Sequence, residues 1–480
     1  MTIINSQPAD PRRTVPQYRP RLFPGALLIP LLLLTTSCTD TNTGSEPRRG
    51  TSGVGDPLFP TLGNGGYDVT HYSLTLDYTP ATHRLRGTAR ITARTTRALS
   101  SFHLDLAGLH VRETTVNGRP ARATRRSTEL TLTPATALPK DRTFTTTVVY
   151  DGKPKTLTDP DGSREGWLRT ADGAVGLGEP TGSMTWFPGN NHPSDKAAYD
   201  IAVTVPRGYA AVSNGELTRR TTRNGRTTHH WRTRDPMATY LATVAIGRFD
   251  IHTTTADGLP QYVAIDPTEA KASRDVPAQI TKITAWERRT FGPYPFASTG
   301  AIVDHLPDLG YALETQTKPY FAAAPDQRLI VHELAHQWFG NSVTPRTWKD
   351  MWLNEGFATY AEWLWTEQHH GRTAQQTFDD FYDGTDDESK GIWAFPPAAP
   401  PSPGHVSDPP VYGRGAMALH QLRRTVGDPT FFRILRTWLK THRHGNADTK
   451  QFITLSKRLS GKPLDKLFKT WLYAKAKPAR

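Results

Sequence analysis

The sequence predicts an α+β protein of two domains, an antiparallel β domain followed by a mostly α-helical one. Two observations carry this prediction. Apolar and polar residues alternate from Tyr67 to about Ile251, and from about Gln261 the apolar residues recur with a helical period. The chain has 480 residues, of which 36% are hydrophobic and 21% charged, as expected for a globular protein of two or three domains.

The chain opens with a predicted export signal over residues 1–38. Basic residues precede an apolar run, residues 27–34, that is too short to span a bilayer, and small polar residues then lead to Cys38. This order resembles a bacterial lipobox, whose cysteine is acylated through its sulfur. We therefore expect Cys38 to carry a lipid that anchors the protein to the outer face of a membrane. A plain secretory signal is the alternative. Because Cys38 is the only cysteine, the chain forms no intrachain disulfide.

Residues 39–57 are rich in Thr, Gly, Ser, Asp and Arg, which predicts a flexible linker. Residues 58–255 then form the predicted β domain, in which short alternating runs are separated by turn dipeptides such as Asn117-Gly118 and Asn224-Gly225. The expected strands include residues 72–78, 88–94, 102–106, 128–133 and 144–150.

Residues 256–480 form the predicted second domain. Residues 383–410, rich in Asp, Gly and Pro, have no periodicity, and such a long irregular stretch is usually functional or mobile. A strand is expected at residues 301–304, and helices at residues 278–290, 354–365, 373–382, 412–426, 430–439, 450–459 and 464–475.

The net charge of +13 does not indicate nucleic-acid binding. The basic residues are scattered, and no basic block is interleaved with aromatic residues in the way that nucleic-acid binders show. We expect a solvated surface and a basic leader instead.

The second domain contains H-E-x-x-H as His332, Glu333 and His336, followed after eighteen residues by Glu355. Positions i and i+4 share a helix face, so two imidazoles can converge on one metal ion, and Glu355 supplies a third ligand. Two histidines and one carboxylate leave the fourth tetrahedral position open for water, which is typical of catalytic zinc. Glu333 is then the base for that water. The H-E-x-x-H pentapeptide alone is also compatible with two histidines that pack under a loop and bind no metal. The additional Glu355, within W-L-N-E-G-F-A, favours a site for one Zn²⁺ per chain.

The chain resembles the M1 (gluzincin) family of zinc aminopeptidases. The motifs that carry the resemblance are V-H-E-L-A-H-Q-W-F-G-N-S-V (331–343), W-L-N-E-G-F-A (352–358), M-A-T-Y-L-A (237–242), E-P-T-G-S-M-T-W-F-P (179–188) and V-Y-G-R-G-A (411–416). The resemblance implies a saddle-like N-terminal β domain and a thermolysin-like catalytic domain. The chain ends soon after Tyr473, where large members continue into a helical C-terminal domain, so we expect two folded domains and an open cleft.

The resemblance also implies residue roles. His332, His336 and Glu355 ligate zinc, and Tyr412 stabilises the oxyanion of the transition state. Glu314, in Y-A-L-E-T, takes the place of the glutamate that binds the substrate's free α-amine, and Glu179 is a second amine-binding position.

Some residues depart from the family pattern. The usual Met and Asn around the amine-binding glutamate are Leu313 and Thr315, and the F-P-C-x-D motif reads F-P-G-N-N at residues 187–191.

We therefore expect a zinc-dependent aminopeptidase that acts on peptides with a free N-terminus outside the cytoplasm. A thermolysin-like endopeptidase and a non-catalytic, surface-tethered binding lipoprotein are the alternatives. Epoxide hydrolysis, known in one branch of the family, has no positive support in the sequence.

Overall fold

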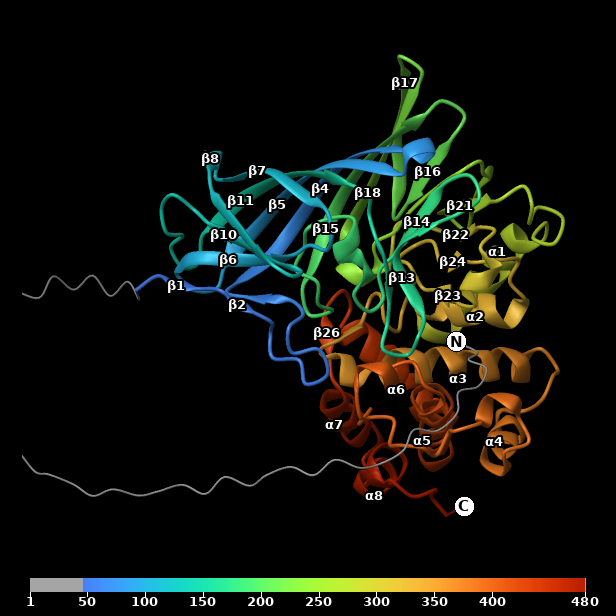
Figure 1. The fold of residues 1–480 in the computed structure, drawn as a ribbon. Helices are drawn as coiled ribbons and strands as arrows, with labels where there is room; N and C mark the ends of the chain where they lie inside the picture. Colours follow the sequence, from blue (N-terminus) through green and yellow to red (C-terminus); the bar gives the residue numbers. More distant parts are fainter. Residues whose placement is uncertain (1–45, 480) are drawn as a thin grey trace, which may run out of the picture.

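The computed structural model describes residues 46–479, which form a β-sheet domain and a mostly helical domain (Figure 1). The sheets of the first half of the chain lie together at one side of Figure 1, and helices α3 to α8 lie at the other. Cys38, the predicted lipidation site, and residues 39–45 lie outside the described residues.

The largest sheet of the first domain has eight strands, and the alternation along β4 buries Tyr72, Leu74 and Leu76 in its core. Every neighbouring pair is antiparallel, as predicted, except β15 and β4, which run parallel. In spatial order the strands are β17 (Glu216–Arg223), β18 (Arg226–Ala238), β15 (Lys196–Pro206), β4 (Tyr67–Thr79), β5 (Arg84–Thr95), β11 (Thr143–Gly152), β7 (His110–Val116) and β8 (Arg119–Pro120).

Three smaller sheets complete the first domain. A four-stranded sheet contains β1 (Arg48–Arg49), β6 (Leu99–Asp105), β10 (Glu129–Thr133) and β9 (Arg122–Arg126). A five-stranded sheet contains β12 (Thr156–Thr158), β13 (Arg164–Arg169), β14 (Ala174–Leu177), β19 (Val244–Gly247) and β16 (Ala210–Ser213), and a two-stranded one pairs β2 (Thr51–Ser52) with β3 (Asn64–Gly65).

The linker predicted over residues 39–57 is wrong for its described part. Strand β1 pairs with β6, and the buried Asp56 accepts hydrogen bonds from the Trp348 backbone N–H at 2.9 Å and contacts His192 Nε2 at 3.1 Å. Backbone pairing and one buried carboxylate order this polar segment. Amino-acid composition alone does not reveal either interaction, so it predicts a flexible linker. The first domain therefore begins before residue 58 and reaches the second domain through Asp56.

The second domain begins earlier than the predicted boundary at residue 256. Strand β20 (Asp250–Ala256) pairs with β21 (Leu259–Ile265) and so belongs to the five-stranded sheet of this domain. The sheet continues through β22 (Thr299–Val303), β24 (Tyr320–Phe321) and β23 (Ala312–Leu313), and a separate pair joins β25 (Thr344–Pro345) to β26 (Asn446–Ala447).

The helices of the second domain pack around α3, which is buried over nearly its whole length. The segment that was predicted to be irregular, residues 383–410, contains only two one-turn helices. The helices are α1 (Val276–Phe291), α2 (Gln327–Ala335), α3 (Trp352–Gln368), α4 (Ala374–Asp383), α5 (Gly415–Val426), α6 (Asp428–Thr441), α7 (Thr449–Ser460) and α8 (Asp465–Phe468), with π-helical segments at Pro410–Arg414 and Lys469–Tyr473.

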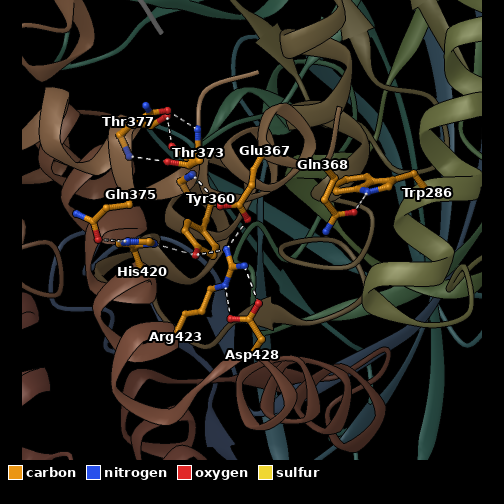
Figure 2. Close-up of polar contacts among 12 residues, drawn as sticks. Trp286, Tyr360, Glu367, Gln368, Thr373, Gln375, Thr377, His420, Arg423 and Asp428 are labelled. Atoms are coloured by element: carbon orange, nitrogen blue, oxygen red, sulfur yellow. Dashed lines mark hydrogen bonds and ion pairs between the residues drawn. The ribbon is translucent and has the colours of Figure 1, made fainter. Parts of the chain in front are cut away.

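A polar network ties α5 to α3 and α4, as Figure 2 shows. The ring of His420 lies between Tyr360 and Gln375, with Nδ1 3.2 Å from the tyrosine hydroxyl and Nε2 3.1 Å from the amide oxygen. One turn along α5, Arg423 donates to Glu367 at 2.8 Å. Because these contacts join three helices, they hold α5 in place along α3.

Candidate active site

The H-E-x-x-H segment covers the end of α2, with His336 as the C-cap residue. The start of α2 is capped by the side chain of Asp326, which accepts from the Leu329 N–H at 2.8 Å. The same helix buries Ile330, Val331 and Leu334 in the core. Helix α3 packs against α2 and carries Glu355 in its first turn. The packing of two helices therefore brings together residues far apart in the sequence.

The three predicted ligands converge on one point. Glu355 Oε2 lies 3.2 Å from His332 Nε2 and 3.4 Å from His336 Nε2, and the ligand atoms of all three residues lie within 4.8 Å of one another. Ligand atoms held about 2.1 Å from one tetrahedral zinc lie roughly 3.4 Å apart. The residues present therefore fit a single Zn²⁺.

Each histidine is oriented by its other ring nitrogen. His332 Nδ1 lies 2.6 Å from Glu362 Oε1, and His336 Nδ1 lies 3.0 Å from the Phe339 carbonyl oxygen. Such contacts fix the tautomer in which Nε2 is free for the metal. Glu362 was not among the predicted site residues. Glu362 follows Glu355 by seven positions on α3, and residues at this spacing share a helix face. The sequence spacing could therefore have identified Glu362 as a site residue.

Glu333 lies in the same site with one side-chain oxygen unbonded. The residue is 5% exposed, and its buried Oε2 has no hydrogen-bond partner in the described part of the chain. Burial raises the pKa of Glu333 to about 7, although the neighbouring His332 and His336 lower it. A carboxylate in this state is suited to accept and release a proton.

Tyr412 reaches the site from the π-helical segment Pro410–Arg414, and its ring stacks on that of His332 with centroids 6.0 Å apart and planes at 14°. Two glycines allow the approach. A Cβ atom on Gly356 would lie 3.0 Å from the backbone of Gly415, so α3 and α5 meet main chain to main chain beside Glu355. π-Helical insertions occur frequently at functional sites.

Arg414 fixes the segment that carries Tyr412. Its guanidinium is fully buried and donates to backbone carbonyls of Phe395 at 3.3 Å and Trp471 at 3.1 Å, among others. These carbonyls lie in the irregular segment and at the last π-helical turn, so one side chain ties three segments together. Burial lowers the pKa of Arg414 to about 10, and the guanidinium therefore stays charged at neutral pH.

The two predicted amine-binding residues lie beside the metal ligands. One carboxylate oxygen each from Glu179, Glu314 and Glu355 lies within 4.8 Å of the others. Glu314 is 3% exposed, and its Oε1 has no hydrogen-bond partner among residues 46–479. Burial, followed by the charge of Glu314, raises the pKa of Glu179 well above its usual value. Carboxylates held this close favour a bound cation.

The structure thus gathers seven predicted residues into one site, and it leaves Cys38 outside the described part of the chain. Those seven are His332, Glu333, His336, Glu355, Tyr412, Glu314 and Glu179. Within residues 46–479, no helix is both long enough and apolar enough to span a membrane.

Comparisons with known proteins match both halves of the chain to one family. The Peptidase M1 N-terminal domain matches residues 69–241, and the Peptidase family M1 domain matches residues 314–471. Among solved structures, the M1 zinc metallopeptidase from Deinococcus radiodurans is 32% identical with a TM-score of 0.80, covering 89% of this chain and 98% of that one. A mutant of that enzyme, solved with a Tyr-Ser-Ala substrate, matches with a TM-score of 0.80 at 31% identity, over 89% of this chain and 99% of that one.

Among characterised sequences, bovine (Bos taurus) glutamyl aminopeptidase is 30% identical over 323 residues, which is 61% of this chain and 33% of the relative. Aminopeptidase M1 of Arabidopsis thaliana is 28% identical over 329 residues, 64% of this chain and 37% of the relative. The chain thus spans about a third of the length of these relatives. Because it covers nearly all of the solved Deinococcus chain at over 30% identity, and both of the family's domains match, the chain belongs to peptidase family M1.

Proposed function

We propose that the protein is a zinc-dependent aminopeptidase that removes N-terminal residues from peptides. The observation that carries this proposal is the position of Glu179 and Glu314, each with a carboxylate oxygen within 4.8 Å of the zinc ligand Glu355. A peptide's N-terminal ammonium bound by these carboxylates has its first peptide bond next to the metal position. The relatives' names, glutamyl aminopeptidase and aminopeptidase M1, support the same activity.

The roles of the chain's own residues follow from their positions. Zinc held by His332, His336 and Glu355 would polarise the scissile carbonyl and acidify the attacking water. Glu333 accepts the proton of that water and passes it to the leaving amine. The Tyr412 hydroxyl donates a hydrogen bond to the charge that develops on the carbonyl oxygen.

The proposal is tested with a panel of aminoacyl-arylamides, assayed with and without a chelator. We expect the chelator to abolish hydrolysis and zinc to restore it. We expect Glu333→Ala to keep the metal, measured by elemental analysis, and to lose nearly all activity. Equal cleavage of N-acetylated and free peptides would remove the exopeptidase assignment and leave an endopeptidase. No hydrolysis of either by the zinc-loaded protein would favour a binding protein.

We also propose that Cys38 is acylated and holds the protein at the outer face of a membrane. The support comes from the sequence alone, in the apolar run 27–34 and the small residues before the cysteine. Membrane fractionation of the wild type and of Cys38→Ser tests this. We expect the substitution to release the protein, and release of the wild type under the same conditions would contradict the anchor.

A further inference from the structure

A cavity of about 510 Å³ lies against the β12–β13 hairpin of the first domain and shares no residue with the candidate active site. Its volume lies in the range of ordinary small-molecule pockets. The lining includes Lys153, Lys155, Arg164 and Arg169, with Trp167 and Leu306 as its apolar part.

The charge of this cavity is unbalanced. Four of its lining residues are cationic and none is acidic. In the described part of the chain, none of the four forms an ion pair, whereas Arg84 and Arg112 on the same domain both pair with Asp151. Two carboxylates close to these cations in sequence already have other partners. Asp151 is contacted by Arg84 and Arg112, and Glu165, next to Arg164, accepts hydrogen bonds from the backbone N–H groups of Thr181 and Gly182. Four like charges therefore line one cavity, and none of them has an ion-pair partner among residues 46–479.

Neighbouring contacts hold two of these cations in place. The aliphatic stem of Lys155 passes over Gly108, where an added Cβ would lie 3.0 Å from its Cδ. Arg164 Nη2 donates to the Asp308 carbonyl oxygen at 3.1 Å, which leaves its remaining N–H groups for another acceptor. Trp167 also lines the cavity and is 2% exposed. Because these contacts already restrict the side chains, binding of an anion would cost less side-chain entropy.

The cavity also joins the two domains. Leu306 in its lining belongs to the second domain, as does Asp308, which Arg164 contacts. The Tyr311 hydroxyl donates to the Arg164 carbonyl oxygen at 2.7 Å. A ligand in the cavity would therefore touch both domains.

We propose that this cavity is a binding site for a small polyanion that carries several phosphate or carboxylate groups. Two guanidinium groups present planar pairs of N–H donors that match the oxygens of such groups, and the two ammonium groups supply compact positive charge. All four cations are exposed, so the affinity falls as salt rises. A neutral ligand would leave the four charges uncompensated, and a monovalent anion would balance only one of them.

Isothermal titration calorimetry with the full chain tests the proposal, with tripolyphosphate and citrate as probes in about 150 mM NaCl. We expect one site per chain, and the tighter of the two probes identifies phosphate or carboxylate as the preferred group. Lys153→Ala/Arg169→Ala should weaken binding at least about tenfold, because two contacts are lost. The matched control is Arg122→Ala/Arg126→Ala on the exposed strand β9, which removes the same charge from residues that do not line the cavity.

The control double variant should bind within about twofold of the wild type. Equal weakening by the two double variants would show that the anion responds to net charge only and would overturn the proposal. No heat of binding from either probe with the wild type would overturn it as well. Lys153→Glu is the second variant if the cavity double variant does not fold by circular dichroism, and it should also weaken binding at least about tenfold.

Discussion

Replacing Glu362 should weaken zinc binding without touching a metal ligand. Glu362 is 7% exposed, and its Oε1 lies 2.6 Å from His332 Nδ1, so it orients the imidazole and increases its basicity. Glutamine keeps an oxygen for that contact but loses the charge, and we expect about tenfold weaker binding, or about 1.4 kcal/mol. Alanine removes the contact and frees the ring, and we expect about a hundredfold, or about 2.7 kcal/mol. Competition with a chromophoric zinc chelator measures both.

The chain offers a matched control. Arg328 contacts both Glu362 and the exposed Glu388, and only the first of these touches His332. Glu388→Gln therefore removes one ion pair of Arg328 and leaves the histidine contact intact, so zinc affinity should stay within about twofold. Wild-type zinc affinity in Glu362→Ala would refute the reasoning, because the ring would then be held by packing alone. Equal losses in Glu362→Gln and Glu388→Gln would assign the effect to Arg328.

Three further results are expected. Tyr412→Phe should lower kcat about 10²–10³-fold with KM nearly unchanged in steady-state assays, and an unchanged kcat would remove the hydroxyl from the chemistry. Gly356→Ala should lower the free energy of unfolding in urea by about 1–3 kcal/mol, since its Cβ would lie 3.0 Å from the backbone of Gly415; wild-type stability would mean that the helices separate freely. Burial, followed by the charges of Arg423 and Arg424, lowers the pKa of His420 from 6.5 to about 4. The unfolded state then binds more protons between these values, so stability present above about pH 6.5 falls by up to about 3 kcal/mol towards pH 4. His420→Gln should flatten this slope in denaturation series, and an unaltered slope would exclude His420 as its source.

The metal ligands were predictable because their geometry is mostly local. His332 and His336 share a helix face whatever the rest of the fold does, and only Glu355 required a tertiary contact. Its position inside a second helical pattern was readable from the sequence. The same spacing argument applied once more along α3 would have found Glu362.

The extent of the first domain was not predictable in the same way. Asp56 forms its hydrogen bond with the Trp348 backbone across 292 positions of sequence, and polar composition around it predicts a linker. Strand β20 has an exposed pattern with no clear alternation, so nothing in its own residues assigns it to one domain or the other. The predicted linker and the predicted boundary at residue 256 were both wrong because the pairing partners of these segments are distant in sequence or not recognisable from their residues.

The close approach of Glu179, Glu314 and Glu355 favours the binding of cations in this site. Carboxylates within 4.8 Å of each other repel when ionised, and loss of hydration raises the pKa of the buried Glu314 as well as that of the half-buried Glu179. A divalent metal at Glu355 and an ammonium at the other two would relieve this repulsion together, because each would bring positive charge next to the cluster. Binding of either the metal or the ammonium would then make the remaining carboxylates easier to ionise. Under the proposed function, one cluster of carboxylates would bind both the metal and the substrate's free N-terminus, and a blocked N-terminus would lose an interaction that the rest of the site does not replace.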